Sequence, residues 1–211
     1  MKATTQHLKT TLRNLLVVLA CMNGDVLAAP QTFDFKDPKG VNNATFRLDA
    51  PLEAISGNAT GISGTVAFDP AAPAATKGKI IVATSSLRVG NPMQQEHMLG
   101  DKWLDAAKHP EISFDAKTLE NVKTQSGTIT ADVTGILRLK GISKEITVPV
   151  KLTYLKDKLG QRVPNQKGDL LVIRANFTIK RSDFGIMPGQ MEEKVADTIE
   201  LTLSIAGAAP R

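Results

Sequence analysis

The stretch TITADVTGILRLKGISKEITVPVKLTY, residues 128–154, contains the pattern that decides the fold. Apolar or small side chains occupy every odd position of residues 129–139, and most of the even positions are polar. This period of two is typical of a β-strand with one buried face. After a short turn that contains Gly141, the alternation resumes over residues 146–154, which predicts an antiparallel hairpin. Pro149 lacks a backbone N–H, so we expect it to face solvent or a bulge.

The same alternation returns in residues 171–179 and 199–205. Shorter strand candidates precede the hairpin, at Ala44–Ala50, Ile62–Phe68, Gly78–Leu87 and Glu111–Lys117. No strand–helix–strand alternation occurs, which disfavours a parallel sheet. The sequence therefore predicts an all-β fold, an antiparallel up-and-down barrel of about eight strands, with a sandwich as the alternative.

One short helical insertion is expected between Asn91 and Ala107. Asn91 suits an N-cap and Pro92 suits the first helical position. Gly100 is expected to break or kink this helix, and the helical turns must end before Pro110.

Residues 1–28 are typical of a secretory signal peptide. Basic residues precede the apolar run Leu15–Met22, and the small residues Val26 and Ala28 follow it. The run is far shorter than the roughly 20 residues that span a bilayer, and no later stretch approaches that length. We therefore predict cleavage after Ala28, a barrel domain over residues 29–211, and no integral membrane segment.

Cys21 allows a second interpretation of the N-terminus. Residues 18–21, Val-Leu-Ala-Cys, resemble a bacterial lipoprotein signal in which the cysteine is lipidated, although Leu19 fits that pattern poorly. We therefore favour a plain cleaved signal over anchoring through Cys21. The mature chain then has no cysteine, which suits an oxidising compartment such as the periplasm.

Composition argues against a nucleic-acid partner. The net charge is +5, but no tract of five adjacent like charges occurs, and the first 28 residues carry part of the excess. Seven Phe, one Trp and one Tyr supply few stacking surfaces for bases. The length of 211 residues suits one folded domain.

Catalytic motifs are absent from the sequence. The mature chain has His97 and His109 as its histidines, so a zinc site would have to borrow carboxylates such as Glu96 or Asp101. Neither a G-x-S-x-G elbow, nor an H-E-x-x-H helix, nor a phosphate-binding G-x-x-x-x-G-K-[ST] loop occurs. We therefore predict a protein that is not an enzyme, with no catalytic residues, metal or cofactor.

The segment from Ser86 to Phe114 resembles the central signature of the YceI-like family. It contains, in order, Ser86-Leu87-Arg88, Glu96-His97-Met98, Trp103-Leu104-Asp105-Ala106 and His109-Pro110-Glu111-Ile112-Ser113-Phe114. The flanking segments Gly64–Asp69, Val133–Lys144 and Arg181–Ile186 resemble family motifs as well. The resemblance covers about residues 40–205.

The sequence departs from the family pattern at three places. Many members carry Arg-Asp where this chain has Gln94-Gln95, and a basic residue where it has Leu99. A His-Ser pair common early in the family is missing near Asn42-Asn43. These departures imply a ligand whose head group is less polar than in those members, or a ligand with no polar head group.

The resemblance implies a lipocalin-like barrel, exported to the periplasm, whose interior binds a polyisoprenoid or other long-chain amphiphilic lipid. It implies no catalysis. The segment from His97 to Trp103 is then expected to cover the entrance. The candidate ligand-binding residues are His97, Met98, Leu99, Trp103, Phe114, Leu137 and Phe184.

A barrel of about eight strands can fill itself with side chains or hold one small ligand. Small residues at the expected inward positions Ala131, Gly135 and Ala175 favour a cavity and hence a lipid carrier. The alternative is a filled barrel that serves as a stress-response or protein-interaction module without a bound lipid. An enzyme with His97 as general base ranks last. The sequence leaves a homodimer open and does not identify the lipid.

Overall fold

The structure, a computed structural model, describes residues 30–211. It contains one antiparallel sheet of eleven strand segments. Six are short: β1 (Gln31–Asp34), β2 (Asn43–Asp49), β3 (Ala54–Ala59), β4 (Ile62–Phe68), β5 (Lys77–Ala83) and β6 (Leu87–Val89). Five are longer: β7 (Glu111–Gln125), β8 (Thr128–Leu139), β9 (Ile142–Leu155), β10 (Gly168–Lys180) and β11 (Thr198–Pro210). The expected signal peptide and Cys21 lie outside the described residues.

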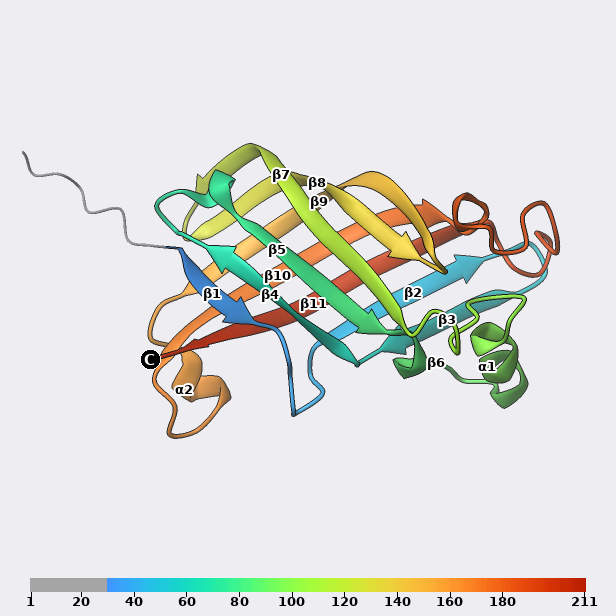
Figure 1. Cartoon of the computed structure of the whole chain (residues 1–211), viewed down its shortest axis with the longest axis horizontal. Coiled ribbons are helices and arrows are strands. Elements are labelled where there is room, and N and C mark those ends of the chain that lie inside the picture. Colours follow the sequence, from blue (N-terminus) through green and yellow to red (C-terminus); the bar gives the residue numbers. More distant parts are fainter. Residues whose placement is uncertain (1–29) are drawn as a thin grey trace, which may run out of the picture.

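The sheet closes into a barrel because β1 pairs with both β4 and β11 (Figure 1). The eleven segments occupy eight strand positions around the barrel. The first three positions are each divided into two segments, β1 with β2, β3 with β4, and β5 with β6, whereas β7 to β11 are continuous. Neighbouring strands are antiparallel throughout. The predicted antiparallel barrel of about eight strands is therefore confirmed.

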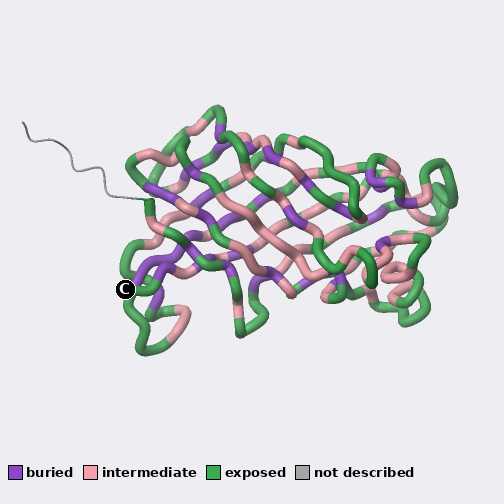
Figure 2. Tube along the Cα trace, viewed as in Figure 1, coloured by how far each residue is buried: buried purple, intermediate pink, exposed green. Residues whose placement is uncertain are grey.

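Buried and exposed residues alternate along the strands, as Figure 2 shows. In β8 every odd position from Ile129 to Leu139 is buried. Leu139 pairs with Ile142 across a two-residue turn in which Lys140 and Gly141 have φ of 48° and 75°. This left-handed conformation matches the twist of a tight hairpin and favours glycine. The predicted hairpin and its inward face are confirmed.

Pro149 marks the point where β9 leaves β10. The ladder between these strands runs from Leu170 paired with Leu155 to Ala175 paired with Val150, and it ends there. Pro149 follows directly, is exposed, and has no N–H to extend the ladder. The expectation that Pro149 faces solvent is met.

The helices differ in part from the sequence-based expectation. Helix α1 (Pro92–Leu99) begins as predicted, since the Asn91 side chain accepts hydrogen bonds from the backbone N–H groups of the first turn. It ends at Gly100, so residues 100–107 form turns rather than a continued helix. A second, four-residue helix, α2 (Leu159–Arg162), was not expected. None of the helices in residues 30–211 combines the length and apolar character that crossing a membrane requires.

Three short strands also escaped the sequence analysis. The expected strand Gly78–Leu87 is divided by the 3-10 turn Thr84–Ser86 into β5 and β6. β1 and β3 carry alternations of only a few residues, too short to be distinguished from loops by period alone.

Asn42 joins the divided first strand position to β11. β1 pairs with β11 at Ala208, and β2 pairs with it up to Ser204. Between them, the Asn42 side chain donates to the Ala206 carbonyl at 3.1 Å and accepts from the Ala206 N–H at 2.9 Å. The buried amide therefore fills one step of the ladder in place of backbone.

Replacing Asn42 by Ala should destabilise the barrel strongly. The substitution leaves the N–H and carbonyl of Ala206 without a partner, along with the Phe35 carbonyl, to which the amide also donates. Each buried unpaired group costs about 1–3 kcal/mol, so for these three groups we expect a loss of at least about 3 kcal/mol in unfolding free energy.

Asn43→Ala is the matched control, because the Asn43 side chain makes its one described bond to the nearby Val41 carbonyl. We expect a loss below about 1 kcal/mol. Equilibrium urea unfolding measures both variants, and equal losses would contradict the role of Asn42.

Candidate functional site: an apolar cavity in the barrel

The barrel encloses a cavity of about 1040 Å³. Inward side chains from most strands line it, and several are small, including Ala44, Ala116 and Ala175. Alanine at these positions leaves space that a larger aliphatic residue would occupy, because interiors are otherwise close-packed. The expectation that small inward residues leave room is met at Ala175, whereas Ala131 is buried without lining the cavity.

Gly135 has a different function from the one expected of an inward small residue. A Cβ atom at this position would lie 2.7 Å from Cζ of Phe114 and 2.5 Å from the Asp115 carbonyl oxygen. The glycine therefore lets the Phe114 ring lie flat against the neighbouring strand, and Phe114 itself lines the cavity.

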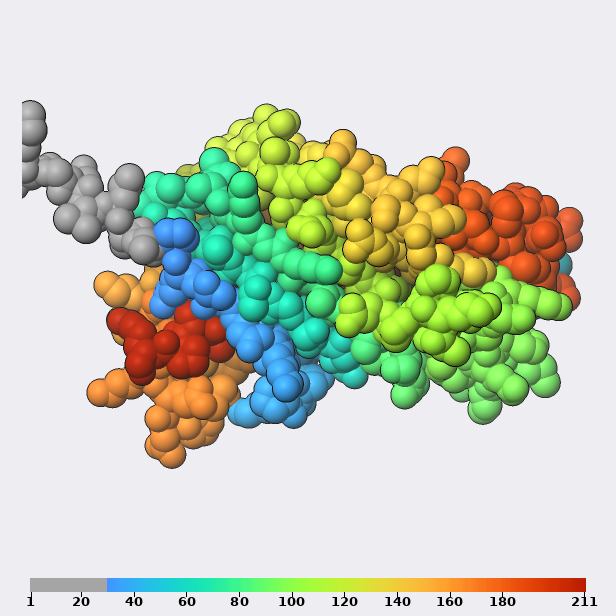
Figure 3. Space-filling model, in the orientation of Figure 1, coloured from blue at the N-terminus to red at the C-terminus, as the bar shows by residue number. Residues whose placement is uncertain are grey.

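One end of the cavity is polar, and we call this end the mouth. It is formed by α1, residues 100–107, residues 181–197 and the turn at residues 50–53. Figure 3 shows the green α1 and the orange-red residues 181–197 at the same end of the molecule. The charged and titratable lining residues all lie here: Glu53, Glu96, His97, Asp101, Lys102, Arg181 and Lys194. Within residues 30–211, no group of three or more His, Cys, Asp or Glu side chains is arranged to hold a metal.

Five of the seven predicted ligand-binding residues line the cavity: His97, Met98, Trp103, Phe114 and Leu137. His97 is exposed on the rim, whereas Leu137 is buried deeper, on β8. Leu99 and Phe184 do not line the cavity, although both pack in a hydrophobic cluster whose other buried members do, and Phe184 is only 1% exposed. These two side chains support the mouth from outside the cavity.

Arg181 holds the mouth together, and the sequence analysis did not single it out as a site residue. Its side chain is 1% exposed, and its five N–H groups all donate to backbone carbonyls of one segment. The acceptors are Ala196 for Nε, Ile186 and Met187 for Nη1, and Gln190 and Val195 for Nη2. Lysine has fewer donors and no planar fork, so it could not replace this arginine.

The Arg181 guanidinium also contacts the other side of the mouth. Its Cζ lies 5.7 Å from the centre of the Trp103 ring, a cation–π distance. Trp103 therefore both lines the cavity and links residues 100–107 to residues 181–197. The motif around Arg181 and Phe184 was recognised in the sequence, but only the folded chain brings it to Trp103.

Asp197 is a carboxylate at the C-terminal end of residues 181–197. Burial alone would raise its pKa, but hydrogen bonds from the hydroxyl and N–H of Ser182, and the charge of Arg181, lower the pKa below its usual value. The carboxylate therefore stays ionised at neutral pH and fixes the turn that follows Arg181.

The sequence pattern of the YceI-like domain matches residues 31–207. The chain belongs to the YceI-like family. It is 25% identical over 201 residues to a UPF0312 protein of Ectopseudomonas mendocina, covering 95% of this chain and 98% of that protein. It is 32% identical over 148 residues to a UPF0312 protein of Pseudomonas savastanoi pv. phaseolicola, covering 68% of each.

Solved structures share the barrel. The YCEI protein of Campylobacter jejuni aligns with a TM-score of 0.59 at 26% identity, over 72% of this chain and 83% of that one. BcnA of Burkholderia cenocepacia aligns with a TM-score of 0.60 at 24% identity, over 78% and 94%. A polyisoprenoid binding domain from Saccharophagus degradans aligns with a TM-score of 0.61 at 12% identity, over 86% and 99%, which shows a common fold.

Two departures from the YceI-like pattern have structural explanations. Gln95 fastens α1 to β6, since its Nε2 donates to the Leu87 carbonyl at 2.8 Å and its Oε1 accepts from the Val89 N–H at 2.9 Å. Leu99 packs against the hydrophobic cluster that includes Leu87, Leu104 and Phe184. Both side chains hold α1 in place, and Gln94 is the one of the Gln94-Gln95 pair that lines the cavity.

Arg181→Lys should loosen the mouth and destabilise the protein. Lysine has three N–H donors, so at least two of the five carbonyls lose their partner, at about 1–3 kcal/mol each. We expect a loss of at least about 2 kcal/mol in unfolding free energy, with faster proteolysis within residues 186–196.

Arg174→Lys is the control, because Arg174 is exposed and donates to two carbonyls that are already in the sheet. It should change stability by less than about 0.5 kcal/mol. If the two variants behave alike in urea unfolding and limited proteolysis, Arg181 does not organise the mouth.

Proposed function

We propose that this YceI-like protein is an exported, periplasmic carrier that holds a polyisoprenoid or other long-chain amphiphilic lipid inside the barrel. The observation that carries the proposal is an apolar cavity of about 1040 Å³ whose charged lining residues all lie at one end. That arrangement complements an amphiphile, with its tail among aliphatic side chains and its head at the rim.

Tail burial supplies most of the binding free energy in this proposal. Each buried methylene contributes about 0.8 kcal/mol, so a tail of a few isoprene units offsets the cost of association. The lining of Leu, Ile, Val and Ala side chains offers no directional contacts to select one tail chemistry. Specificity must then come from shape and from the mouth.

The mouth fits a neutral or weakly polar head rather than a diphosphate. Acidic Glu53, Glu96 and Asp101 stand among basic Lys102 and Lys194, so no concentrated positive field forms. Arg181 is already committed, because all five of its N–H groups donate to carbonyls. The absence of the family's Arg-Asp pair at Gln94-Gln95 supports the same conclusion.

The competing functions fit the cavity less well. A filled barrel that acts by protein contacts would leave no space of this size inside. Among residues 30–211, no carboxylate lies within ion-pair distance of His97, so the orienting group that a general base commonly uses is not present there. The polyisoprenoid binding domain of Saccharophagus degradans, which has the same fold, further supports a carrier that acts by binding.

Adding geranylgeraniol to delipidated protein should change the emission of Trp103 saturably, near one ligand per chain. Trp103 is the single tryptophan and lies on the cavity wall, so its surroundings change when a ligand enters. Ala175→Phe places a ring inside the cavity and should weaken binding at least tenfold.

Thr178→Phe is the matched control, since it adds the same ring to the same strand on the exposed face. It should bind like the unchanged protein. No saturable response to any long-chain amphiphile, with no lipid extracted from the purified protein by organic solvent, would refute the carrier and favour the filled-barrel alternative.

Export should give a mature chain that begins at Ala29. The basic start, the short apolar run and the small residues Val26 and Ala28 direct signal cleavage there. Intact-mass measurement after expression of the full chain in a Gram-negative host tests this expectation. A chain starting at an acylated Cys21 would establish the lipoprotein alternative, and an uncleaved cytoplasmic chain would refute export.

A further inference from the structure

The cavity ends at one level on five strands. Its deepest lining residues include Val66 on β4, Val133 on β8, Leu152 on β9, Ile173 on β10 and Leu203 on β11. Two positions further from the mouth, the inward residues are Phe68, Ala131, Tyr154, Leu171 and Ile205, none of which lines the cavity. The cavity therefore has a floor rather than a second opening at this level.

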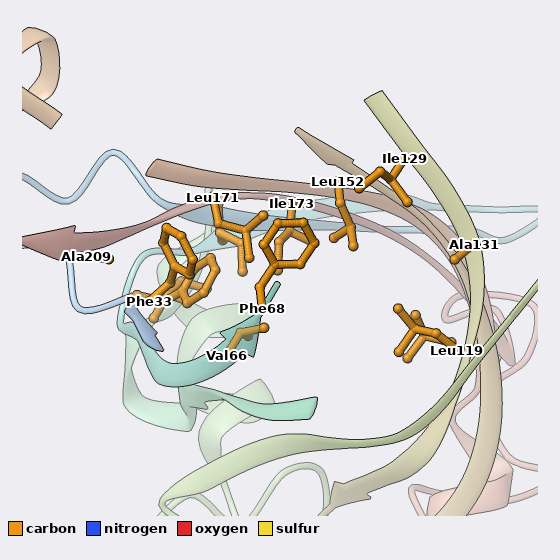
Figure 4. Packing of buried hydrophobic residues seen from close by; sticks show 14 residues of the cluster. Phe33, Val66, Phe68, Leu119, Ile129, Ala131, Leu152, Leu171, Ile173 and Ala209 are labelled. Atoms are coloured by element: carbon orange, nitrogen blue, oxygen red, sulfur yellow. The ribbon is translucent and has the colours of Figure 1, made fainter. Parts of the chain in front are cut away.

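Three aromatic rings, which we call the floor rings, block the barrel below that level. The ring centres of Phe33 and Phe68 lie 6.3 Å apart, and Tyr154 lies 6.3 Å from Phe33 and 5.9 Å from Phe68. Figure 4 shows Phe33 and Phe68 beside Leu171 and Ile173, while Leu119 projects from the opposite wall. Phe33 and Phe68 are fully buried, so neither residue is accessible from the cavity.

Polar contacts fix the floor rings in place. The Tyr154 hydroxyl donates to Asp169 at 2.8 Å, and the same carboxylate accepts from the Asp157 N–H and from Arg211, each at 2.8 Å. Burial and the neighbouring carboxylate raise the pKa of Tyr154 to about 12, so the hydroxyl keeps its proton. An incoming tail would have to break this network to pass.

We infer that the floor rings set the length of tail that the cavity accepts, because they fill the barrel directly below the deepest lining residues. The inference rests on the proposed lipid carrier and adds a limit that the carrier alone does not require. Affinity should rise with each isoprene unit until the tail reaches the floor, and a longer tail must then leave apolar surface in water at the mouth.

A substitution that changes the depth of the cavity at the floor should change the preferred tail length. Removing the Phe68 ring by Phe68→Ala frees a volume of about one isoprene unit, so the preferred tail should lengthen by about one unit. Val66→Phe adds a ring just above the floor and should shorten the preferred tail by a similar amount. Because Val66→Phe removes no core ring, it tests the inference even if Phe68→Ala fails to fold.

Phe177→Ala is the matched control for loss of a ring. Phe177 lines the cavity wall on β10 towards the mouth, so its removal widens the cavity without lowering the floor. This variant should bind more weakly at every length while the preferred length stays the same.

The experiment measures binding of geraniol, farnesol, geranylgeraniol and longer linear prenyl alcohols to each delipidated protein, by Trp103 emission and native mass spectrometry. The expected result is a break in affinity against length that shifts up in Phe68→Ala, down in Val66→Phe and not in Phe177→Ala. Saturable binding with no break, or a break that Val66→Phe leaves unmoved, would overturn the floor as the length limit and leave the carrier intact. No binding at any length would overturn the carrier itself.

Discussion

Closure of the sheet through Asn42 is the contact on which the cavity depends. A sheet encloses space only when its first strand position meets its last, and here the first position is divided between β1 and β2. The Asn42 amide takes the place of a backbone step by bonding both polar groups of Ala206. Arg162 of α2 donates to the same amide at 2.9 Å and to Asp37, so the segment between β1 and β2 is fixed from both sides. Burial alone would raise the pKa of Asp37, but hydrogen bonds from the backbone N–H groups of Asn42 and its neighbours lower it below its usual value. That carboxylate therefore stays charged near neutral pH.

Once the barrel is closed, the distribution of aromatic residues decides which end stays open. Phe33, Phe35, Phe68 and Tyr154 all lie in the cluster at the end opposite the mouth. Glycine makes room for one of them, because a Cβ at Gly207 would lie 2.6 Å from the Phe35 ring. The rest of the interior carries mainly aliphatic and small side chains, with Phe46, Trp103, Phe114 and Phe177 on the cavity wall, and these line the space without filling it. One chain therefore builds a packed end and a hollow end from the same alternating strands.

The sequence predicted what depends on local periodicity and missed what depends on distant partners. The odd positions of β8 point inward because a strand places alternate side chains on one face, and no tertiary information is needed to see it. Asn42 was noted only as a departure from a family pattern, because its partner Ala206 is 164 residues away. Arg181 belonged to a recognised motif, yet its five carbonyl acceptors and Trp103 become visible only in the folded chain. Leu99 was predicted as a ligand contact within the segment expected to cover the entrance, and Phe184 lies in a separate family-like motif. Both pack in a hydrophobic cluster without lining the cavity.

The two ends also differ in how firmly they are held, and this difference bears on how a ligand enters. The floor combines fully buried rings with the Asp169 network, and residues 181–197 are tied to the buried Arg181. Helix α1 contains no fully buried residue and is attached to the barrel through Gln95, through partly buried Met98 and Leu99, and through its short connections. Local opening has the lowest free energy where few apolar contacts are lost, so α1 is the mouth segment that can be displaced at least cost. Displacing α1 would break none of the five hydrogen bonds of Arg181 and none of the contacts of the floor rings.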